Sequence, residues 1–386
     1  MMIEIDWKKI GLSDNPFLLT PPESPDTAMW AGVAELKKQF ESILSEAKGS
    51  ALNQVILCRG PVGGGKTHAS IYFSNPKNWP NHKLSVRDSL VWKINTPKET
   101  GKPDRDFYIN LMEYIGMDHM RPVIASNIDL LGYESAQDIL RKTTESADIT
   151  KAILMLGADP DNELIDSYFL GKPTRAELKK LKLTRALEKN QDYFRVLAGV
   201  IRCYTGLDKD MSVSKHSRIC LWIDEMEDFV YFTPAQYRSF GQGLRDLIDR
   251  VPGFFSTFFN FTLSTGEESE EIELILGKAL VDRVTNHVFF QELDHGEMLR
   301  YVAEVLRHHR MPAFDAPNEY YPFEEQSLHS LLTDLQRRTP RDVNKRCRNA
   351  IVRAFQSGLF QSNGQVTIAK EFVKKLNLEE LDRELG

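Results

Sequence analysis

Residues 60–67 read GPVGGGKT, and this stretch decides the fold class. It satisfies the pattern G-x-x-x-x-G-K-[S/T] in full, it follows the apolar residues 55–58, and it opens the helical stretch 67–73. Its four glycines let the backbone turn tightly and point N–H groups at a polyphosphate. The residues expected to contact a nucleotide are Gly60, Pro61, Val62, Gly63, Gly64, Gly65, Lys66, Thr67 and His68.

Two side chains of this stretch carry specific chemistry. Lys66 supplies a point charge to the β and γ phosphates, and the hydroxyl of Thr67 ligates Mg²⁺. The helix that starts at Thr67 adds its positive N-terminal end. The stretch therefore predicts a nucleoside triphosphate bound with Mg²⁺, and we expect the nucleotide to be ATP. A loop that binds no nucleotide would leave Lys66 and Thr67 unexplained.

A second stretch, RICLWIDEMEDF at residues 218–229, places two acids after an apolar strand. Two carboxylates at the end of a buried strand need surroundings that stabilise their negative charges. Beside a phosphate-binding loop, Asp224 can hold Mg²⁺ through water, and Glu225 can orient and deprotonate the attacking water. The alternative is two solvated acids at a strand end. The pair predicts hydrolysis in addition to binding.

Composition limits the remaining possibilities. The chain has 386 residues, 41% of them hydrophobic and 27% charged, which is typical of a globular protein with two or three domains. No apolar run is long enough to span a membrane, and the first residues lack the apolar region of a signal peptide. The net charge of −6 means that any contact with nucleic acid must come from local patches. The four scattered cysteines favour small buried side chains and a reducing, cytoplasmic location.

Strands and helices are expected to alternate along the first three quarters of the chain. The expected strands are residues 55–58, 90–94, 219–223, 254–263 and 288–290. The expected helices are residues 32–48, 107–115, 294–309, 325–338 and 340–357, with residues 120–215 mostly helical between breaks at 157–160 and 171–173, and one charged helix in the tail. This order favours an α/β fold with a parallel sheet, followed by a small helical domain.

Three domains follow from this organisation. We expect an N-terminal arm at residues 1–30, a nucleotide-binding core at residues 31–292, and a helical lid with its tail at residues 293–386. The core is expected to contain a large helical insertion at about residues 118–212, because the segment between the two motifs is much longer than in a plain AAA+ core, the class that the chain resembles.

The chain resembles the AAA+ P-loop ATPases, and among them the origin-recognition proteins and transposition regulators. GPVGGGKT and LWIDE are similar to the Walker A and Walker B motifs of that class. The resemblance covers most of residues 10–357. It implies an αβα core with a parallel sheet and a C-terminal helical lid.

Three further segments carry this resemblance. FTLSTGE resembles the sensor strand, where Thr265, or alternatively Asn260, touches the γ-phosphate or the water. In ALVDRVTNHVFF, Arg283 is similar to an arginine that faces the nucleotide of a neighbouring subunit. In RRTPRDVNKRCRNAI, Arg341 resembles a second sensor that reaches the γ-phosphate. Each has a simpler alternative: a turn residue for Thr265, a surface ion pair for Arg283 and a solvated charge for Arg341.

The insertion carries a narrower resemblance. Its segment YFLGKPTRAELKKLKL and the helix 192–204 look like the ATP-binding proteins of phage-exclusion (BREX-type) defence systems. Two stretches are locally basic, residues 171–190 and 336–353, and such stretches can neutralise phosphates of nucleic acid. A solvated helix face or a subunit contact is the alternative for both.

Together these features predict an ATPase that binds and hydrolyses ATP with Mg²⁺. The resemblance implies a homo-oligomer, with Glu225, Lys66, Arg283 and Thr265 as its catalytic residues. Its expected partners are DNA and a partner protein, in a nucleic-acid-associated complex of genome defence, transposition or replication. Two alternatives stay open: a nucleotide-gated protein scaffold, and a signalling ATPase without direct contact to DNA.

Overall fold

A computed structural model gives the fold of the chain. It describes residues 5–49, 52–79, 89–98, 101–159, 162–171, 173–207, 216, 218–262, 268–361, 364–378 and 382. The chain forms two compact units, each assembled from segments that are far apart in the sequence. Unit 1 comprises Met1–Phe40, Gly60–Tyr72 and Phe289–Gly386, and unit 2 comprises Glu41–Arg59 and Phe73–Val288.

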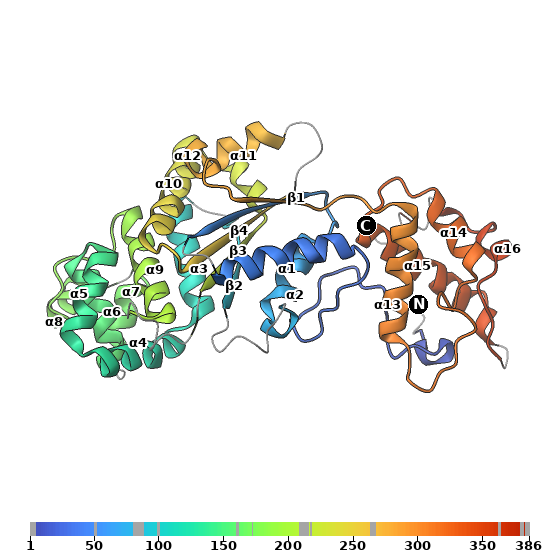
Figure 1. The fold of residues 1–386 in the computed structure, drawn as a ribbon, viewed down its shortest axis with the longest axis horizontal. Helices are drawn as coiled ribbons and strands as arrows, with labels where there is room; N and C mark the ends of the chain where they lie inside the picture. Colours follow the sequence, from blue (N-terminus) through green and yellow to red (C-terminus); the bar gives the residue numbers. More distant parts are fainter. Residues whose placement is uncertain are drawn as a thin grey trace. The chain divides into compact units, whose positions relative to one another are not determined.

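A five-stranded parallel sheet has the strand order β2-β3-β4-β1-β5 (Figure 1). Its strands are β1 (Gln54–Gly60), β2 (Leu90–Asn95), β3 (Ile219–Asp224), β4 (Phe255–Thr262) and β5 (Asn286–Phe289). All five predicted strands are present, with ends that differ by one or two residues. Every residue of β3 is buried, which explains its uninterrupted apolar run. The expectation of an α/β fold with a parallel sheet is therefore confirmed.

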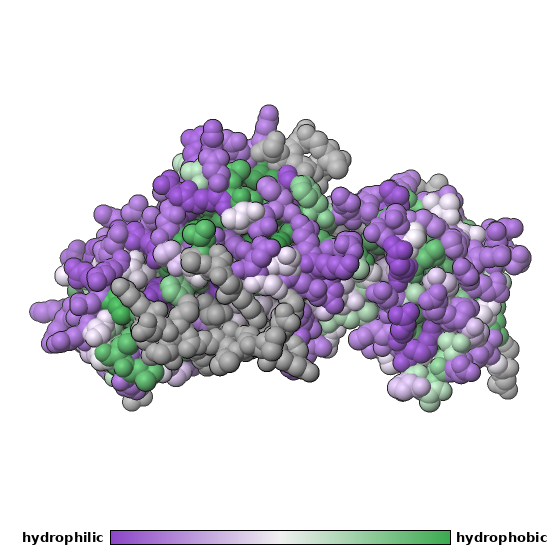
Figure 2. Space-filling view, viewed as in Figure 1, coloured by the Kyte–Doolittle hydropathy of each residue, from purple (hydrophilic) through white to green (hydrophobic). Residues whose placement is uncertain are grey.

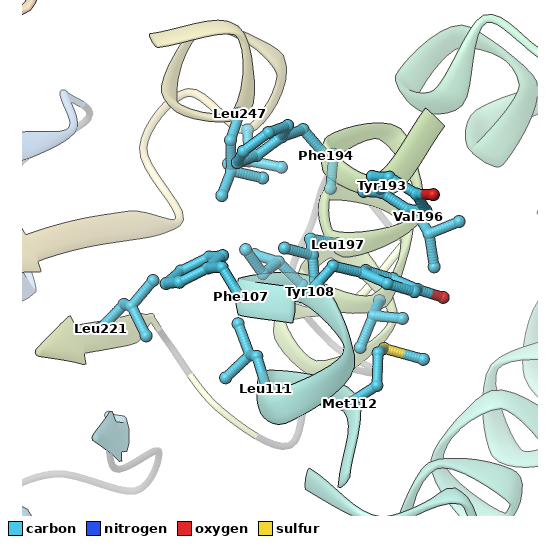
Figure 3. Close-up of a cluster of buried hydrophobic side chains, with 14 of the residues drawn as sticks. Phe107, Tyr108, Leu111, Met112, Tyr193, Phe194, Val196, Leu197, Leu221 and Leu247 are labelled. Carbon is cyan, nitrogen blue, oxygen red and sulfur yellow. The ribbon is translucent and has the colours of Figure 1, made fainter. Parts of the chain in front are cut away.

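Three helices of unit 2 build the core beside β2 and β3: α3 (Pro103–Ile115), α9 (Asn190–Thr205) and α10 (Pro234–Arg250). Figure 3 shows the aromatic rings that join them. The ring centroid of Phe107 lies 5.0 Å from that of Phe240 and 6.4 Å from that of Phe194. Tyr108 stacks on Tyr193 at 5.0 Å. These large aromatic side chains are buried, and their burial stabilises the unit.

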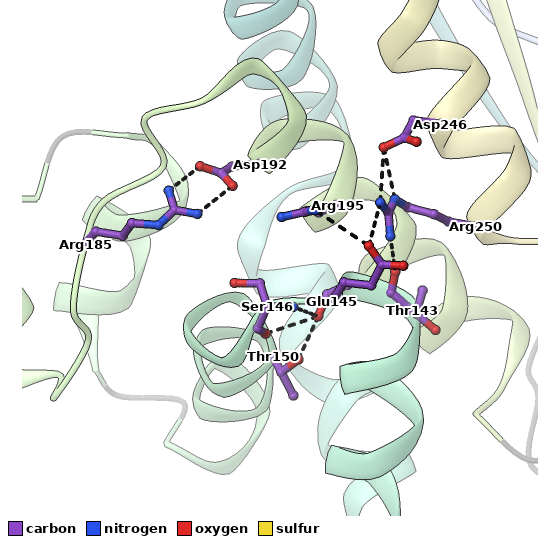
Figure 4. Close-up of polar contacts among 10 residues, drawn as sticks. Thr143, Glu145, Ser146, Thr150, Arg185, Asp192, Arg195, Asp246 and Arg250 are labelled. Carbon is purple, nitrogen blue, oxygen red and sulfur yellow. Dashed lines mark hydrogen bonds and ion pairs between the residues drawn. The ribbon is translucent and has the colours of Figure 1, made fainter.

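The long segment between the two motifs folds as helices. They are α4 (Met117–Leu131), α5 (Tyr133–Thr144), α6 (Ala147–Ala158), α7 (Glu163–Phe169) and α8 (Arg175–Lys180), which precede α9. The ends of α6 and α7 confirm both predicted breaks. Figure 4 shows how Arg250 of α10 holds the end of α5: its guanidinium donates to the carbonyl of Thr143 at 3.2 Å and to Glu145 at 3.0 Å.

Unit 1 has its own hydrophobic core. Helices α13 (His295–His309), α14 (Glu325–Thr333) and α15 (Pro340–Gln356) supply most of it. Residues of the N-terminal segment complete it, among them Ile10 and Phe17, which are fully buried. The expected domain boundaries at residues 30 and 292 stay predictions.

One helix prediction in unit 1 was too long. Helix α14 ends at Thr333, before the predicted residue 338, because Asp334 leaves the helical conformation. In the tail α16 (Lys370–Val373) is a short helix, Leu378 and Asp382 are also helical, and Ile368 forms an isolated bridge with Phe323. Residues 379–381 and 383–386 of the predicted tail helix lie outside the described residues.

The remaining elements are short or flank the sheet. They are α1 (Ala34–Gly49), α2 (Lys66–Ser74), α11 (Glu268–Leu276), α12 (Lys278–Val281) and the 3₁₀ turns Trp7–Ile10, Pro76–Asn78, Met226–Tyr231 and Leu359–Gln361. No helix in the described part of the chain is both long and apolar enough to cross a bilayer. The four cysteines are buried, as predicted for Cys58 and Cys220 from their apolar neighbours.

A buried carboxyl group lies where α3, α9 and α10 meet. Asp104 is 2% exposed and accepts a hydrogen bond from the amide of Asn190 at 2.8 Å. The same amide donates to the hydroxyl of Ser239 at 2.8 Å. Burial raises the pKa of Asp104 to about 6, although the Ser239 hydrogen bond acts in the opposite direction. The folded protein therefore favours the neutral form of Asp104 more strongly than the unfolded chain does.

This shift predicts a pH-dependent effect of Asp104→Asn. A raised carboxyl pKa contributes stability that is present below the unfolded pKa and is lost as the pH rises to about 6. The substitution removes the ionisable group, so we expect the variant to gain about 1–3 kcal/mol relative to wild type between pH 4 and pH 7. Urea unfolding of both proteins across this range measures the difference. A difference independent of pH would contradict the assignment.

Candidate functional site

The Walker A loop, residues 60–67, lies in unit 1 and closes around its own lysine. Lys66 begins α2, and its ammonium donates to the carbonyls of Gly60 at 2.8 Å and Pro61 at 2.9 Å. The side chain is 6% exposed. Both hydrogen bonds hold the ammonium group inside the turn. An anionic phosphate oxygen is a stronger acceptor for such an ammonium group.

The start of α15 lies against this loop within unit 1. The amide of Arg341 donates to the carbonyl of Gly63 at 3.4 Å. Gly63 has φ +80°, and a β-carbon added there would lie 2.8 Å from Cβ of Arg341 and 2.9 Å from the hydroxyl oxygen of Thr339. Only glycine combines this conformation with so close an approach. The structure thus brings together Arg341 and the Walker A loop, two parts of the predicted site.

The local sequence explains the position of Arg341. Thr339 caps α15: its hydroxyl accepts a hydrogen bond from the amide of Asp342 at 3.3 Å and donates to the carboxylate of Asp342 at 2.6 Å. Pro340 occupies the first helical position. Arg341 follows in the first turn and is exposed, so its guanidinium is available beside the loop.

His68 contacts the N-terminal segment. A ring nitrogen, Nε2, lies 2.6 Å from the carbonyl oxygen of Met29, and the ring of Trp30 is 6.5 Å away. Burial lowers the pKa of His68, and the Met29 contact offsets only part of this effect. The ring is thus neutral near pH 7, and it is engaged with Met29 in this structure. Val62, which was expected in the same set, is 52% exposed.

The acidic pair lies in unit 2. Asp224 ends β3 and is 4% exposed. Its Oδ1 accepts hydrogen bonds from the amide of Glu225 at 3.1 Å and from the side-chain amide of Asn260 at 3.2 Å. Lys93 lies 3.9 Å from Oδ2. Since β4 pairs with β3, Asn260 reaches this carboxylate from the neighbouring strand.

The donor set suits Mg²⁺. This ion prefers oxygen ligands and keeps several of its waters. Asp224 supplies a carboxylate in unit 2, and the hydroxyl group of Thr67, in unit 1, stays a predicted ligand. In addition, Oδ1 of Asn260 is buried and has no hydrogen-bond partner among the residues that the structure describes. A buried acceptor of this kind requires a partner, and a water molecule fits it.

Glu225 is held by a lysine that sequence reasoning missed. Its Oε2 lies 2.8 Å from Nζ of Lys98, which also lies 3.6 Å from Asp228. The hydrogen bond with Glu225 and then its charge raise the pKa of Lys98. β2 is parallel to β3, with Asn95 opposite Asp224, so residues after both strands leave the same sheet edge. The sequence signal that could have identified Lys98 was a lysine in the polar loop after β2.

The backbone of Glu225 is unusual. Its φ and ψ are 60° and 41°, the left-handed region that L-residues rarely adopt. Such a conformation costs about 1–3 kcal/mol and persists only where the surrounding structure enforces it. It turns the chain sharply after β3 and aims the Glu225 side chain toward Lys98.

Of the two remaining predicted site residues, the structure describes Arg283 but not Thr265. Arg283 forms a bidentate ion pair with Asp249, with nitrogen–oxygen distances of 2.9 and 3.2 Å, and donates to the carbonyl of Ala279 at 2.7 Å. Within one chain it is therefore an ion-pair residue, and its role toward another subunit stays a prediction. Thr265 lies outside the described residues. Asn260, the alternative sensor, is the residue that contacts Asp224.

Comparisons with known proteins place the fold. No protein-family model matches the chain, and no curated protein matches its sequence. Among solved structures, the ORC2 protein of Aeropyrum pernix, in ADPNP–ADP complexes, is similar with a TM-score of 0.51 and 9% identity, over 97% of this chain and 73% of that one.

Two further solved structures are similar at lower scores. The ORC1 protein of Aeropyrum pernix in complex with DNA has a TM-score of 0.46 and 10% identity, over 95% of this chain and 69% of that one. Drosophila ORC bound to DNA has a TM-score of 0.49 and 10% identity, over 95% of this chain and 63% of that one. The strand order, the parallel sheet and the likeness to the ORC2 protein agree: the chain has the AAA+ fold and resembles the origin-recognition proteins.

Proposed function

We propose that this protein binds ATP with Mg²⁺ and hydrolyses it. One observation carries the proposal: the Walker A loop encloses the buried ammonium of Lys66, which donates to the carbonyls of Gly60 and Pro61, while Arg341 approaches the same loop at Gly63. Two cations on one glycine-rich turn favour a polyphosphate ligand. The ORC2 protein of Aeropyrum pernix, which has the same fold, was solved with nucleotides, and this supports the assignment.

Each residue then has a definite role. Lys66 and Arg341 bind the phosphates, and the amides of the loop surround them. Asp224 and Thr67 supply oxygen ligands for Mg²⁺, which when bound polarises the phosphate and balances the developing charge. Glu225 accepts a proton from the attacking water. Asn260 positions that water through its free Oδ1 and keeps Asp224 in place.

The ion pair with Lys98 restrains the catalytic base. While Glu225 pairs with Lys98, its carboxylate is oriented away from a role as proton acceptor, so hydrolysis requires this pair to open. Both side chains are partly exposed, with 57% of Lys98 and 38% of Glu225 accessible. Exposed pairs contribute no more than about 1 kcal/mol, so the restraint is easily released.

The wider role is also a proposal. We infer a homo-oligomer in which Arg283 exchanges Asp249 for the nucleotide of a neighbouring subunit. We further infer that the assembly regulates or remodels a nucleic-acid-associated complex in genome defence, transposition or replication. The likeness of the insertion to phage-exclusion proteins is the basis for genome defence, and no comparison above bears on it. The described elements are compatible with a cytoplasmic location, which also stays a prediction.

Replacement of the proposed base tests hydrolysis. We expect Glu225→Gln to lower ATP turnover by about 10²–10⁴-fold and to leave ATP affinity within a few-fold of wild type, because the amide keeps the shape but accepts no proton. Phosphate release and ATP titration measure the two quantities. Asp228→Asn, which removes a charge from the same Lys98 cluster, is the matched control and should retain turnover. Equal losses in both variants would argue against Glu225 as the base.

Removal of the ion pair between Lys98 and Glu225 should raise ATP turnover. We expect Lys98→Ala to raise basal turnover by up to about five-fold, since an exposed ion pair of about 1 kcal/mol no longer competes for Glu225. ATP affinity should not change. Steady-state kinetics separate kcat from KM. A fall in kcat would mean that Lys98 assists the reaction and does not restrain it.

The contact between the loop and α15 can be tested with two adjacent glycines. Gly63→Ala introduces a β-carbon at positive φ and 2.8 Å from Arg341, so we expect at least a ten-fold loss of ATP affinity from about 1–2 kcal/mol of strain and the displaced helix. Gly64→Ala meets its nearest neighbour, the carbonyl of Pro61, at 3.1 Å without positive φ. Gly64→Ala should therefore lower ATP affinity less than Gly63→Ala does. Equal losses would show that α15 does not shape the loop.

A further inference from the structure

Four exposed cations gather on one short segment of the insertion. They form what we call the basic platform: Arg175, Lys179, Lys180 and Lys182. The first three lie on α8, which buries no side chain, and Lys182 lies two residues after its end. Figure 1 labels α8 beside α5 and α6, and Figure 2 shows a hydrophilic surface at the same end of the view.

The platform is held firmly although its own side chains are solvated. Leu181, Leu183 and Leu187 are buried in the core of unit 2. The carboxylate of Asp148 accepts hydrogen bonds from the amides of Thr184 at 2.9 Å and Arg185 at 3.2 Å, and from the Thr184 hydroxyl. Three apolar anchors and this carboxylate fix the loop behind the helix.

A buried ion pair completes the anchorage. Arg185 donates both terminal nitrogens to Asp192, at 2.5 and 2.8 Å, and the Asp192 side chain is fully buried (Figure 4). Burial alone would raise the pKa of Asp192, but the bonds from Arg185 and the amide of Lys189 outweigh it and lower the pKa. Asp192 is thus a charged partner of Arg185 and is not available to the platform.

Three acids at this segment, Glu177, Asp148 and Asp192, are used internally. Glu177 closes the capping box of α8, where it accepts a hydrogen bond from the amide of Thr174 at 2.6 Å. That amide lowers the pKa of Glu177. Asp148 and Asp192 are engaged as described above. Within the described part of the chain, no ion pair joins any carboxylate to the four platform cations, so their charges face solvent together.

The platform concentrates positive charge. Arg175 and Lys179 lie one helical turn apart, and like charges at this spacing repel. Lys182 has a positive φ of 54° where α8 ends: the amide of Leu183 donates to the carbonyl of Leu178 at 2.9 Å, which closes the C-terminus of the helix. The carbonyl of Lys182 accepts from the ammonium of Lys151 at 2.9 Å, which brings a further cation to the platform. Repulsion among exposed, anchored cations favours an anionic ligand that compensates it.

We propose that the basic platform binds the phosphate backbone of a nucleic acid, with a DNA duplex as the favoured form. This proposal rests on the nucleic-acid role proposed above and specifies its surface. No aromatic side chain belongs to the platform, so it offers phosphate contacts without base stacking. In the other basic stretch three cations pair with carboxylates: Arg346 with Asp382, Arg337 with Asp342 and Arg338 with Glu292.

The test is a charge reversal with a matched control. In the variant Lys179→Glu, Lys180→Glu, Lys182→Glu, binding of a fluorescent DNA duplex is measured over a series of salt concentrations. The control reverses three exposed lysines elsewhere, Lys278→Glu, Lys374→Glu and Lys375→Glu, so the net charge changes equally. A glutamine version of the platform variant guards against misfolding. ATP turnover without DNA is measured for every protein.

The expected result is specific to the platform. Duplex affinity should fall at least ten-fold in both platform variants, and the slope of log K against log salt should decrease by about two to three, while the control retains both. ATP turnover without DNA should stay at the wild-type level in all variants. Preferential loss of single-strand binding would overturn the duplex assignment.

Other outcomes would overturn the platform itself. If the platform variants bind duplex as the control does, another surface holds the nucleic acid. If wild-type protein hydrolyses ATP but binds neither duplex nor single strand, the platform has no nucleic-acid ligand and the ATPase proposal stands. Absence of turnover in the wild-type protein would instead count against the proposed function, independently of the binding result.

Discussion

The burial of the Lys66 ammonium within its own loop is the constraint on which the candidate site depends. A buried cation is costly unless hydrogen bonds satisfy it. The carbonyls of Gly60 and Pro61 do this here, and the tight turn that aims both at one atom requires glycine-rich backbone. The ammonium group is a source of positive potential within the loop. The rest of the proposed chemistry serves the anion that this potential attracts.

The surrounding structure extends this arrangement in two ways. Within unit 1, the capped start of α15 brings Arg341 to the loop at Gly63, so a helix of the lid contacts the phosphate-binding turn directly. Within unit 2, β4 lies beside β3 and brings Asn260 to Asp224, while the loop after β2 brings Lys98 to Glu225. Asn260 thus orients Asp224, and Lys98 restrains Glu225.

The sequence predicted the strands, most helices and the helical insertion, because these depend on local periodicity and on motifs with a fixed mechanism. It overestimated α14, where local turn geometry at Asp334 overrode an apolar pattern. It missed Lys98 and the buried Arg185–Asp192 pair, because pairs between residues distant in the chain leave no periodic signal. It named Thr265 as the sensor, with Asn260 as the alternative; Thr265 lies outside the described residues, and the pairing of β4 with β3 brings Asn260 to Asp224.

The central claim is that the Walker A loop binds ATP with Mg²⁺, and calorimetric titration of the folded full-length chain tests it most directly. The account predicts a saturable heat with one site per chain for ATP in magnesium, lost in Lys66→Ala while the circular dichroism spectrum is retained. Absence of heat with ATP and with GTP on folded wild-type protein would contradict it. Equal binding by the Lys66→Ala variant would contradict the role of the buried ammonium.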